Sequence, residues 1–338
     1  MTSPTGAGSL SSVPDDLLIM GIEASALRVD AVITDLEGNV AGRGRAGFAS
    51  PTVMPIPDVA AHLAGAMAKA LDGIDPLSVR AVVVGTAGIL SFQRGASAVK
   101  LAWLWKDAGF ACPITIVADA VTAFAAGTTR PSGSVLIAGA GAIAARVDRE
   151  EVTDRIDGNG WLVGDDGSGF WIGRHAVRAV FAALEGRAEE TLLSDAVLSA
   201  IARGEPVPHE RRAKVDLLRD AVYDGPPIAL AALAPLVPAA AEAGDRVAHR
   251  IVEQAVRLLV DAAAAVVRED AGEPLVLAGS LMSGEGLIGR EVKRRLAERL
   301  GRPPIIARPG AGGALWLAAR RIDRGFGEKA HALFTALG

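Results

Sequence analysis

Residues 134–173 read SVLIAGAGAIAARVDREEVTDRIDGNGWLVGDDGSGFWIG, and this stretch decides the fold. Its first part holds three short runs that are apolar or alternating, at 134–138, 142–147 and 152–156. A Gly-Ala-Gly turn follows the first run, and the polar residues 148–151 separate the second from the third. Short runs joined by turn residues indicate strands, so the sequence predicts a three-stranded antiparallel meander here.

The remainder of this stretch, residues 157–173, contains six glycines, three aspartates and two tryptophans. This composition is unsuited to a core element, because glycine loses much entropy on folding and buried carboxylates need partners. Carboxylates next to aromatic rings are typical of a sugar site, where they accept hydrogen bonds from hydroxyls while the rings pack on C–H faces. We interpret the segment as a candidate sugar-binding loop and keep a flexible surface loop as the alternative.

A similar meander is predicted near the start of the chain, from residues 17–23, 29–35 and 40–46, with Glu37-Gly38-Asn39 as a turn. Buried strands and helical periodicity follow each meander. In the first half we expect strands at 81–84 and 114–117 and helices at 58–71, 96–108 and 120–126. In the second half we expect a strand at 275–278, helices at 286–300 and 251–267, and a final helix at 313–321.

The repeated pattern predicts an α/β protein with two duplicated lobes. We assign residues 17–130 to an N-terminal α/β lobe and residues 131–338 to a C-terminal α/β lobe. Periodicity is almost entirely helical from about 172 to 270, which predicts a helical insertion in the second lobe. Residues 1–16 are largely small, polar and proline-containing, and predict a disordered start.

The composition argues against several classes of protein. Lys and Arg total 35 and Asp and Glu total 39, with no block of five or six like charges, so we expect no nucleic-acid partner. Cys112 is the one cysteine, which excludes a disulfide within the chain and argues against a Cys-based zinc site. The most membrane-like stretch, 228–241, is short and contains two prolines. With no signal-peptide pattern, we expect a cytoplasmic protein that spans no membrane.

Several well-known catalytic and nucleotide-binding motifs are missing from the sequence. It contains no HxxxH or HExxH, no GxSxG and no GxxxxGK[ST]. These absences argue against a zinc hydrolase, an α/β-hydrolase elbow and a P-loop nucleotide site.

Asp119 follows the predicted buried strand at 114–117. In parallel α/β sheets ligands bind beyond the carboxyl ends of the strands, and a carboxylate there can accept a proton from a substrate hydroxyl. Aspartate is also a favoured N-cap, so capping of the helix at 120–126 is the alternative.

Three glycine-containing turns are further candidates for ligand binding. Two of them follow predicted strands, and the third precedes a predicted helix. Gly139-Ala140-Gly141-Ala142 offers N–H groups to a phosphate, with a plain tight turn as the alternative. Residues 139–144 also fit the dinucleotide pattern GxGxxA, but that pattern requires a helix next and a hairpin is predicted instead. The segments 277–280 (LAGS) and 309–314 (PGAGGA) can admit an adenine ring, or serve as ordinary turns.

Taken in order, these motifs resemble the N-acetylglucosamine kinase group of the BadF/BadG/BcrA/BcrD ATPase family, in the sugar kinase and actin superfamily. The resemblance covers roughly residues 19–320. Its most specific part is GWLVGDDGSGFWIG at 160–173, which is similar to the family's GGWGxxxGDEGSGYWIG. The resemblance implies an actin-like ATPase fold built from two ribonuclease-H-like lobes.

The resemblance also implies an activity and roles for individual residues. It implies an ATP-dependent kinase that phosphorylates an amino sugar, N-acetylglucosamine or glucosamine, at the 6-hydroxyl, with Asp119 as catalytic base. It implies Mg²⁺ on the ATP phosphates, with Glu23 near the metal through water, and a homodimer. The implied sugar-binding residues are Ser50, Ala87, Gly88, Gly160, Trp161, Asp165 and Asp166. The implied ATP-binding residues are Glu23, Ser25, Arg28, Gly139, Ala140, Gly141, Ala142, Gly279, Ser280, Gly312 and Gly313.

The sequence departs from the family pattern in its phosphate loops. Where the family reads roughly GxDGGGTKT or GxEGGGTR, residues 21–28 read GIEASALR, without three glycines and a threonine. Ala140 and Ala142 replace the Thr and Ser of GTGS, and Ser50 replaces an Asn that holds the sugar. Each lost hydrogen bond to a charged phosphate is worth about 1.5–3 kcal/mol. These departures motivate a second hypothesis, a non-catalytic or weakly catalytic sugar sensor of the same fold.

Two other activities of such folds do not fit. A dehydratase-activating ATPase needs cysteines for an iron–sulfur cluster, and Cys112 stands alone. A sugar-responsive repressor needs an N-terminal helix-turn-helix, for which we expect the 16 residues before the first strand to be too few. Among sugars, N-acetylglucosamine, glucosamine and muramic-type sugars stay open.

Overall fold

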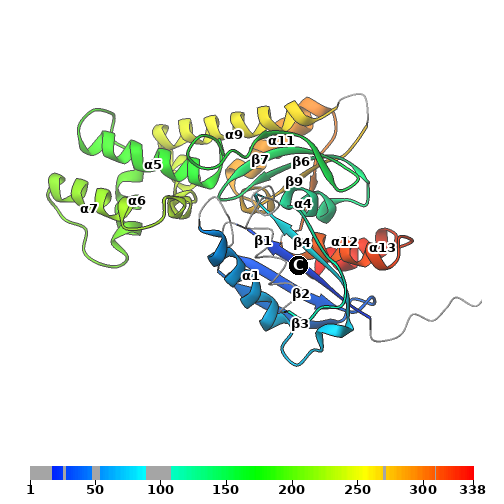
Figure 1. Ribbon diagram of the computed structural model, residues 1–338. Helices are drawn as coiled ribbons and strands as arrows, with labels where there is room; N and C mark the ends of the chain where they lie inside the picture. Colours follow the sequence, from blue (N-terminus) through cyan, green and yellow to red (C-terminus); the bar gives the residue numbers. More distant parts are fainter. Residues whose placement is uncertain (1–16, 26–27, 48–53, 89–107, 269–271, 309) are drawn as a thin grey trace, which may run out of the picture.

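The structure is a computed structural model that describes residues 17–25, 28–47, 54–88, 108–268, 272–308 and 310–338. Its frame is two five-stranded sheets with the same strand order, β3-β2-β1-β4-β5 and β8-β7-β6-β9-β10 (Figure 1). The first three strands of each sheet form an antiparallel meander, and the other two run parallel to the first. The predicted duplicated α/β architecture is therefore confirmed.

The strand bounds follow the predicted runs closely. The first sheet contains β1 (Leu18–Ala24), β2 (Val29–Thr34), β3 (Val40–Ala46), β4 (Val79–Thr86) and β5 (Ile114–Ala118). The second contains β6 (Ser132–Ala138), β7 (Ala142–Asp148), β8 (Glu151–Asp157), β9 (Leu275–Ala278) and β10 (Ile305–Ile306). Strand β4 reads as a nearly continuous valine run because it is buried on both faces, as central parallel strands are.

Two helices cross between the sheets. Helix α4 (Asp119–Gly127) follows β5 of the first sheet and packs on β6 and β9 of the second. Helix α12 (Gly312–Ile322) follows β10 of the second sheet and packs on β1 and β4 of the first (Figure 1). Both helices share one buried apolar cluster with the two sheets. Because each helix belongs to one sheet by sequence and packs on the other, the lobe boundary near residue 130 stays a prediction.

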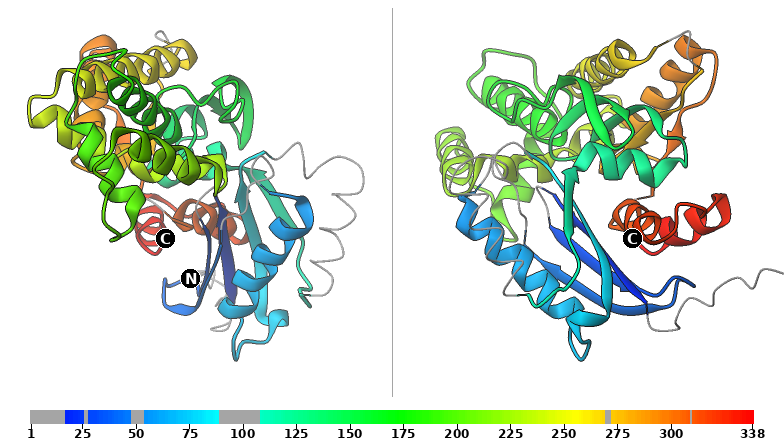
Figure 2. Two further views of the ribbon diagram at one scale, coloured as in Figure 1. Left: turned by 90° about the vertical axis from the view of Figure 1, so that its left-hand side faces the viewer. Right: turned by 45° about the vertical axis from the view of Figure 1, so that its right-hand side comes forward.

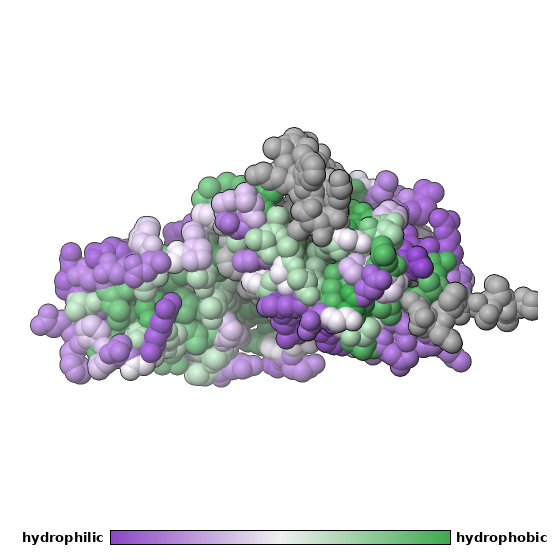
Figure 3. Space-filling model, turned by 60° about the horizontal axis from the view of Figure 1, so that its bottom comes forward, coloured by the Kyte–Doolittle hydropathy of each residue, from purple (hydrophilic) through white to green (hydrophobic). Residues whose placement is uncertain are grey.

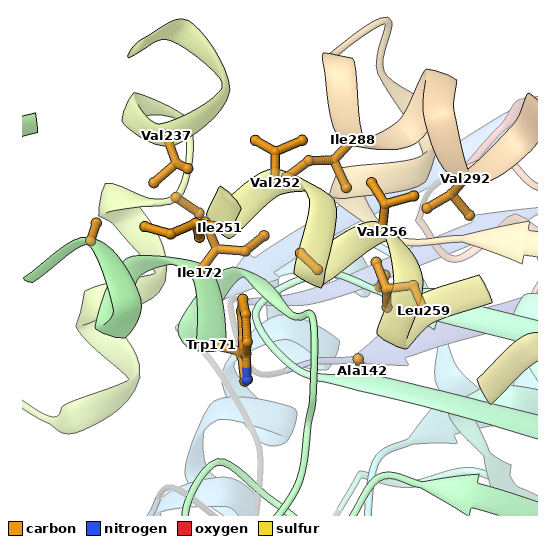
Figure 4. Packing of buried hydrophobic residues seen from close by; sticks show 14 of the residues in the cluster. Ala142, Trp171, Ile172, Val237, Ile251, Val252, Val256, Leu259, Ile288 and Val292 are labelled. Carbon is orange, nitrogen blue, oxygen red and sulfur yellow. The ribbon is translucent and has the colours of Figure 1, made fainter. Parts of the chain in front are cut away.

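Other helices cover the outer faces of the sheets. Helix α1 (Ile56–Ala70) packs on β2 and β3 and buries Leu63 and Met67 against the first sheet. On the second sheet, α9 (Arg246–Val266) packs on β6, β7 and β8, with α11 (Leu287–Leu300) beside it (Figure 2). Figure 4 shows Val252 and Val256 of α9 packed with Ile288 of α11 in this core.

The helices between β8 and α9 form an arm at one side of the second sheet (Figure 1). The predicted insertion, about 172–270, also included α9, which packs on the second sheet instead. Asp245 ties this arm to α9: its carboxylate caps α9 by accepting the N–H of Ala248, and it also accepts the N–H of Leu192 and the hydroxyl of Thr191. Hydrophilic residues gather at the outer end of the arm in the view of Figure 3. The arm consists of α5 (Gly169–Leu184), α6 (Leu193–Ala202), α7 (Arg211–Tyr223), the 3-10 helix η2 (Pro227–Leu233) and α8 (Leu236–Glu242).

Some sequence-based expectations are wrong or fall outside the described residues. The helix at 313–321 is not the last, because α13 (Glu328–Ala336) follows it. Strand β10 was not expected; it has two exposed residues, too few to show a period. The short elements η1 (Pro76–Ser78) and α10 (Ser280–Ser283) were also missed. The expected helix at 96–108 lies almost wholly outside the described residues.

Among the described residues, no single helix has both the length and the apolar character needed to cross a membrane. One pair, Arg211–Tyr223 with Pro227–Glu242, meets that test only when the two are taken together, and it is bent by 120°.

Candidate active site

Three strand ends of the first sheet meet at one edge, because the last residues of β1, β4 and β5 share one register row. The residues that follow them, Ser25, Ala87 and Asp119, therefore stand at neighbouring positions beyond the carboxyl ends of the strands. Gly88 comes directly after Ala87 and is exposed. This is the edge at which parallel α/β sheets bind their ligands.

Asp119 is the first residue of α4, and its Oδ1 accepts the N–H of Ala120 at 2.9 Å. The N-cap of α4 is Ala118, one residue earlier than expected, and the Asp119 carboxylate still accepts an N–H of the first turn, so helix capping stays open as an alternative role. Burial raises the pKa of the Asp119 carboxyl, and the N–H of Ala120 only partly opposes this. A raised pKa makes this carboxylate a better proton acceptor at neutral pH.

Glu23 lies near the end of β1, close enough to Asp119 for their charges to repel. Burial, then the charge of Asp119 and that of Asp30, raise the pKa of Glu23 to about 7, while Arg28 opposes the shift. Two neighbouring carboxylates attract a cation, and a metal ion bound to phosphate is one such cation. Within the described residues, no three His, Cys, Asp or Glu side chains group so as to hold a metal ion by themselves.

The β1–β2 turn carries one arginine toward this edge. The Ser25 N–H donates to the carbonyl oxygen of Arg28, and the Ser25 hydroxyl bonds both the N–H and the carbonyl of Arg28. The Arg28 side chain pairs with Asp30, which also accepts Arg45 Nε at 2.6 Å. Asp30 is thus paired with two arginines.

The turn between β6 and β7 is fixed by the start of α5. The carbonyl oxygens of Gly139 and Ala140 accept the N–H groups of Gly169 and Phe170 at 2.7 and 3.1 Å. The N–H of Gly139 donates to the carbonyl of Gly141 at 2.9 Å. In the described part of the chain, the N–H groups of Ala140 and Gly141 have no acceptor. Unused N–H groups on a glycine turn are suited to bind an anion.

Ala142 ends this turn as the first residue of β7. Its side chain is buried in the apolar core of the second lobe, together with Trp171 and Leu259 (Figure 4). Its N–H faces the Asp165 carboxylate. A hydroxyl added at position 142 would therefore lie among apolar side chains, and the effect of the missing hydroxyl on phosphate binding stays a prediction.

The segment 157–168 forms a closed loop beside this turn. Asp165 has a left-handed backbone, with φ of 57°, and is buried; Asp166 next to it is exposed. Burial, then the charge of Asp157, raise the pKa of Asp165 to about 6, while the N–H groups of Ala142 and Gly160 oppose the shift. The rings of Trp161 and Phe170 pack edge to face, with their centroids 5.5 Å apart. Leu162, the next residue after Trp161, is exposed.

One organising residue of this loop was not singled out from the sequence. Asp157, the last residue of β8, accepts the N–H of Asp165 with Oδ1 at 2.8 Å and the N–H of Asp166 with Oδ2 at 2.7 Å. The contact spans eight or nine residues within one loop, so no periodic pattern marks it. Only the density of carboxylates in this segment pointed to it.

The remaining predicted ATP-site residues lie at helix starts. Ser280 begins α10 beside Gly139, where a Cβ on Gly139 would stand 3.7 Å from the Ser280 hydroxyl; Gly279 is its N-cap. Gly312 and Gly313 are buried where α12 packs on α13 and α4. Whether their backbone also contacts ATP stays a prediction. Ser50 lies outside the described residues.

Comparison with known proteins gives one family and several relatives. The model of the BadF/BadG/BcrA/BcrD ATPase family matches residues 20–318. An N-acetylmuramic acid/N-acetylglucosamine kinase from Clostridium acetobutylicum is 29% identical over 188 residues, 55% of this chain and 58% of that protein. An N-acetyl-D-glucosamine kinase from Dictyostelium discoideum is 27% identical over 231 residues, 66% of this chain and 69% of that protein. The chain thus spans less than two thirds of the first of these relatives.

Solved structures show the same fold. A proposed N-acetylglucosamine kinase from Chromobacterium violaceum has a TM-score of 0.71 at 19% identity, covering 90% of this chain and 100% of that one. The two-lobed actin-like architecture expected from the sequence is therefore confirmed.

Proposed function

The chain belongs to the BadF/BadG/BcrA/BcrD ATPase family, and from this premise we propose that it is an ATP-dependent amino-sugar kinase. The proposed substrate is N-acetylglucosamine or glucosamine, phosphorylated at the 6-hydroxyl. The observation that carries the proposal is Asp119, a carboxylate of raised pKa at the strand-end edge, beside the second carboxylate Glu23.

Asp119 is the catalytic base of the proposed reaction. It accepts the proton of the sugar hydroxyl as that oxygen attacks the γ-phosphorus of ATP, and ADP leaves. Phosphoryl transfer passes through a loose transition state, so correct placement of the hydroxyl contributes more than strong basicity. The bond to the Ala120 N–H holds the Asp119 carboxylate in place for this.

The sugar is proposed to lie between the first-lobe edge and the loop 157–168. Asp165 and Asp166 accept hydrogen bonds from its hydroxyls, and Trp161 packs on a C–H face. The Gly160 backbone, Ala87 and Gly88 complete the pocket, and Ser50 is proposed to contact the sugar from outside the described residues. The N–H groups of Ala142 and Gly160 act on the Asp165 carboxylate, and its remaining acceptor positions are proposed to serve the sugar hydroxyls.

The ATP phosphates are proposed to bind the two turns. Ala140 and Gly141 offer their unused N–H groups, and Arg28 and Ser25 approach from the other lobe. Gly139 and Ala142 shape this turn, and Gly279, Ser280, Gly312 and Gly313 border the adenosine. When bound to ATP, Mg²⁺ neutralises the phosphate charge. Glu23 fits a water-mediated contact to such an ion, because burial, and then its neighbouring carboxylates, raise its pKa and a cation would stabilise its charged form.

The cellular setting is proposed from the family. We place the enzyme in the cytoplasm, where ATP is available, and expect it to form a homodimer. Closure of the two lobes around the substrates would exclude water and limit ATP hydrolysis.

A sugar sensor of the same fold is the second candidate. It is favoured by the sequence of the β1–β2 turn, GIEASALR, which lacks the glycines and threonine of the family's phosphate loop. A sensor would bind the amino sugar without transferring phosphate.

The test is to incubate the protein with ATP, Mg²⁺ and a panel of hexoses, amino sugars and muramic-type sugars, and to follow ADP release. The product is then examined by NMR for phosphorus coupling to the C6 protons. Sugar-dependent ADP release with a 6-phosphate product supports the proposal. Sugar binding by calorimetry without ADP release would favour the sensor. A protein that neither binds nor phosphorylates any of these sugars would contradict both proposals.

A further inference from the structure

The carboxylate of Asp157 binds two consecutive backbone N–H groups. Oδ1 accepts from Asp165 at 2.8 Å and Oδ2 accepts from Asp166 at 2.7 Å. Two successive N–H groups that converge on one anion form a backbone nest. A nest arises where a residue of left-handed backbone conformation stands next to a right-handed one or lies in a turn. Asp165 supplies the left-handed residue, with φ of 57°.

This contact holds a backbone that aspartate does not favour. The left-handed region is costly for residues with a Cβ, although aspartate tolerates it better than most. Gly164 makes room for the contact, because a side chain at that position would collide with Asp157 Oδ1. Without the carboxylate, both N–H groups would lose their acceptor and the left-handed turn would lose its main restraint.

The same contact acts on the side chain of Asp165. The carboxylate of Asp165 points back to the β6–β7 turn, where a Cβ on Gly141 would lie 2.9 Å from Oδ2. Asp157 and Asp166 are the carboxylates whose charges act on Asp165, and Asp157 contributes the larger share. Asp157 thus holds the backbone of Asp165 and, after burial, is the next cause that raises the pKa of the Asp165 carboxyl.

We infer that Asp157 is a positioning residue for the sugar site: it fixes the backbone of Asp165 and Asp166 so that their carboxylates meet the sugar hydroxyls together. The inference rests on the proposed function, since it presumes that Asp165 binds the sugar. A purely structural role, in which Asp157 only closes a surface loop, predicts different results.

The main variant is Asp157→Asn, which keeps one acceptor oxygen but removes the charge. We expect the Kd for the sugar to rise about tenfold, corresponding to about one lost hydrogen bond. The kcat at saturating sugar should change less than the sugar affinity, because the substitution leaves Asp119 in place. Asp154→Asn is the matched control: Asp154 lies on the same strand and is exposed, and its carboxylate accepts the N–H of the neighbouring Arg155.

The pH dependence of sugar binding separates positioning from loop stability. In the wild type the affinity should fall as the pH falls through about 6, where Asp165 takes up a proton. Removing the Asp157 charge lowers the pKa of Asp165, so in Asp157→Asn this decline should move to lower pH. A structural role would lower affinity equally at every pH.

Gly164→Ala provides an independent variant in case Asp157→Asn folds poorly. Its methyl group crowds Asp157 Oδ1 but leaves the charge in place. Sugar affinity should fall while the pH at which binding declines stays near the wild-type value.

Calorimetric titration of each variant with N-acetylglucosamine and glucosamine, from pH 5 to 8, decides the matter. Weaker binding with the shifted decline in Asp157→Asn, and with an unshifted decline in Gly164→Ala, supports the inference. If Asp165→Asn loses sugar binding while Asp157→Asn binds as the wild type does, the inference is wrong and the proposed function stands. If the wild type binds no sugar, or Asp165→Asn binds unchanged, the proposed sugar site itself is wrong and the inference falls with it.

Discussion

The backbone carbonyl of Thr122 in α4 occupies the space where a side chain on Gly313 of α12 would lie. On its other side, the Thr122 side chain fills the space beside Gly85 at the end of β4. The Thr122 hydroxyl donates to the carbonyl oxygen of Asp119 at 3.0 Å. The helix that carries Asp119 is therefore wedged between β4 and α12, and the candidate base is held by both lobes.

Gly313→Ala tests this wedge. The added methyl group would collide with the α4 backbone, so the free energy of unfolding should fall by about 1–3 kcal/mol. Chemical denaturation followed by circular dichroism measures it. Gly65→Ala in α1 is the control: a Cβ there meets nothing within 4 Å, and the change should add about 0.5–1 kcal/mol of helix propensity. Equal stability of the two variants would mean that α4 and α12 are not in close contact.

Ala142→Ser tests the placement of the second phosphate turn. Although it restores the serine of the family's GTGS pattern, it would bury a hydroxyl among apolar side chains. We expect a loss of about 1–3 kcal/mol in the free energy of unfolding and no gain in ATP affinity. The same change at Ala140, which belongs to no apolar cluster among the described residues, should cost less. A lower KM for ATP in Ala142→Ser, at full stability, would contradict this placement.

Asp245 gives a pH-dependent test of how the helical arm is attached. Burial alone would raise its pKa, but hydrogen bonds from Ala248, Leu192 and Thr191 outweigh burial and lower it. Since the folded-state pKa is below the unfolded value of about 3.9, the stabilisation is present above that pH and is lost as the pH falls through the folded pKa. Asp245→Ala should cost about 2–4 kcal/mol near pH 7, from the lost cap and unpaired donors.

The comparison across pH completes that test. The difference in the free energy of unfolding between the wild type and Asp245→Ala should shrink as the pH is lowered from 6 toward 3. A difference that stays constant over this range would show that the charged form of Asp245 does not contribute to the attachment.

Much of the frame could be predicted from the sequence because its signals are local. The two meanders are short runs with turn residues between them, and β4 is a continuous valine run, so period and composition sufficed. Asp119 could be placed because it directly follows a buried strand. The strand β10 could not, since two exposed residues carry no period, and α13 was overlooked beyond the helix taken as final.

The inner organisation of the site was less accessible from sequence. Asp157 acts on N–H groups eight and nine residues away through a loop with no periodicity. The direction in which Ala142 points depends on α5 and α9 packing over the turn, which the motif itself does not contain. Gly312 and Gly313 matched a ligand-site motif, yet their most evident role in the structure is the close approach of helices.

The central claim is that Asp119 is the base of a sugar kinase, and the most direct measurement compares the wild type with Asp119→Asn. Sugar-dependent ADP release and calorimetric sugar binding are measured on both proteins. The account predicts that the variant loses at least about 100-fold in kcat while its Kd for the sugar stays within about threefold of the wild type. Near-wild-type turnover in Asp119→Asn would contradict it.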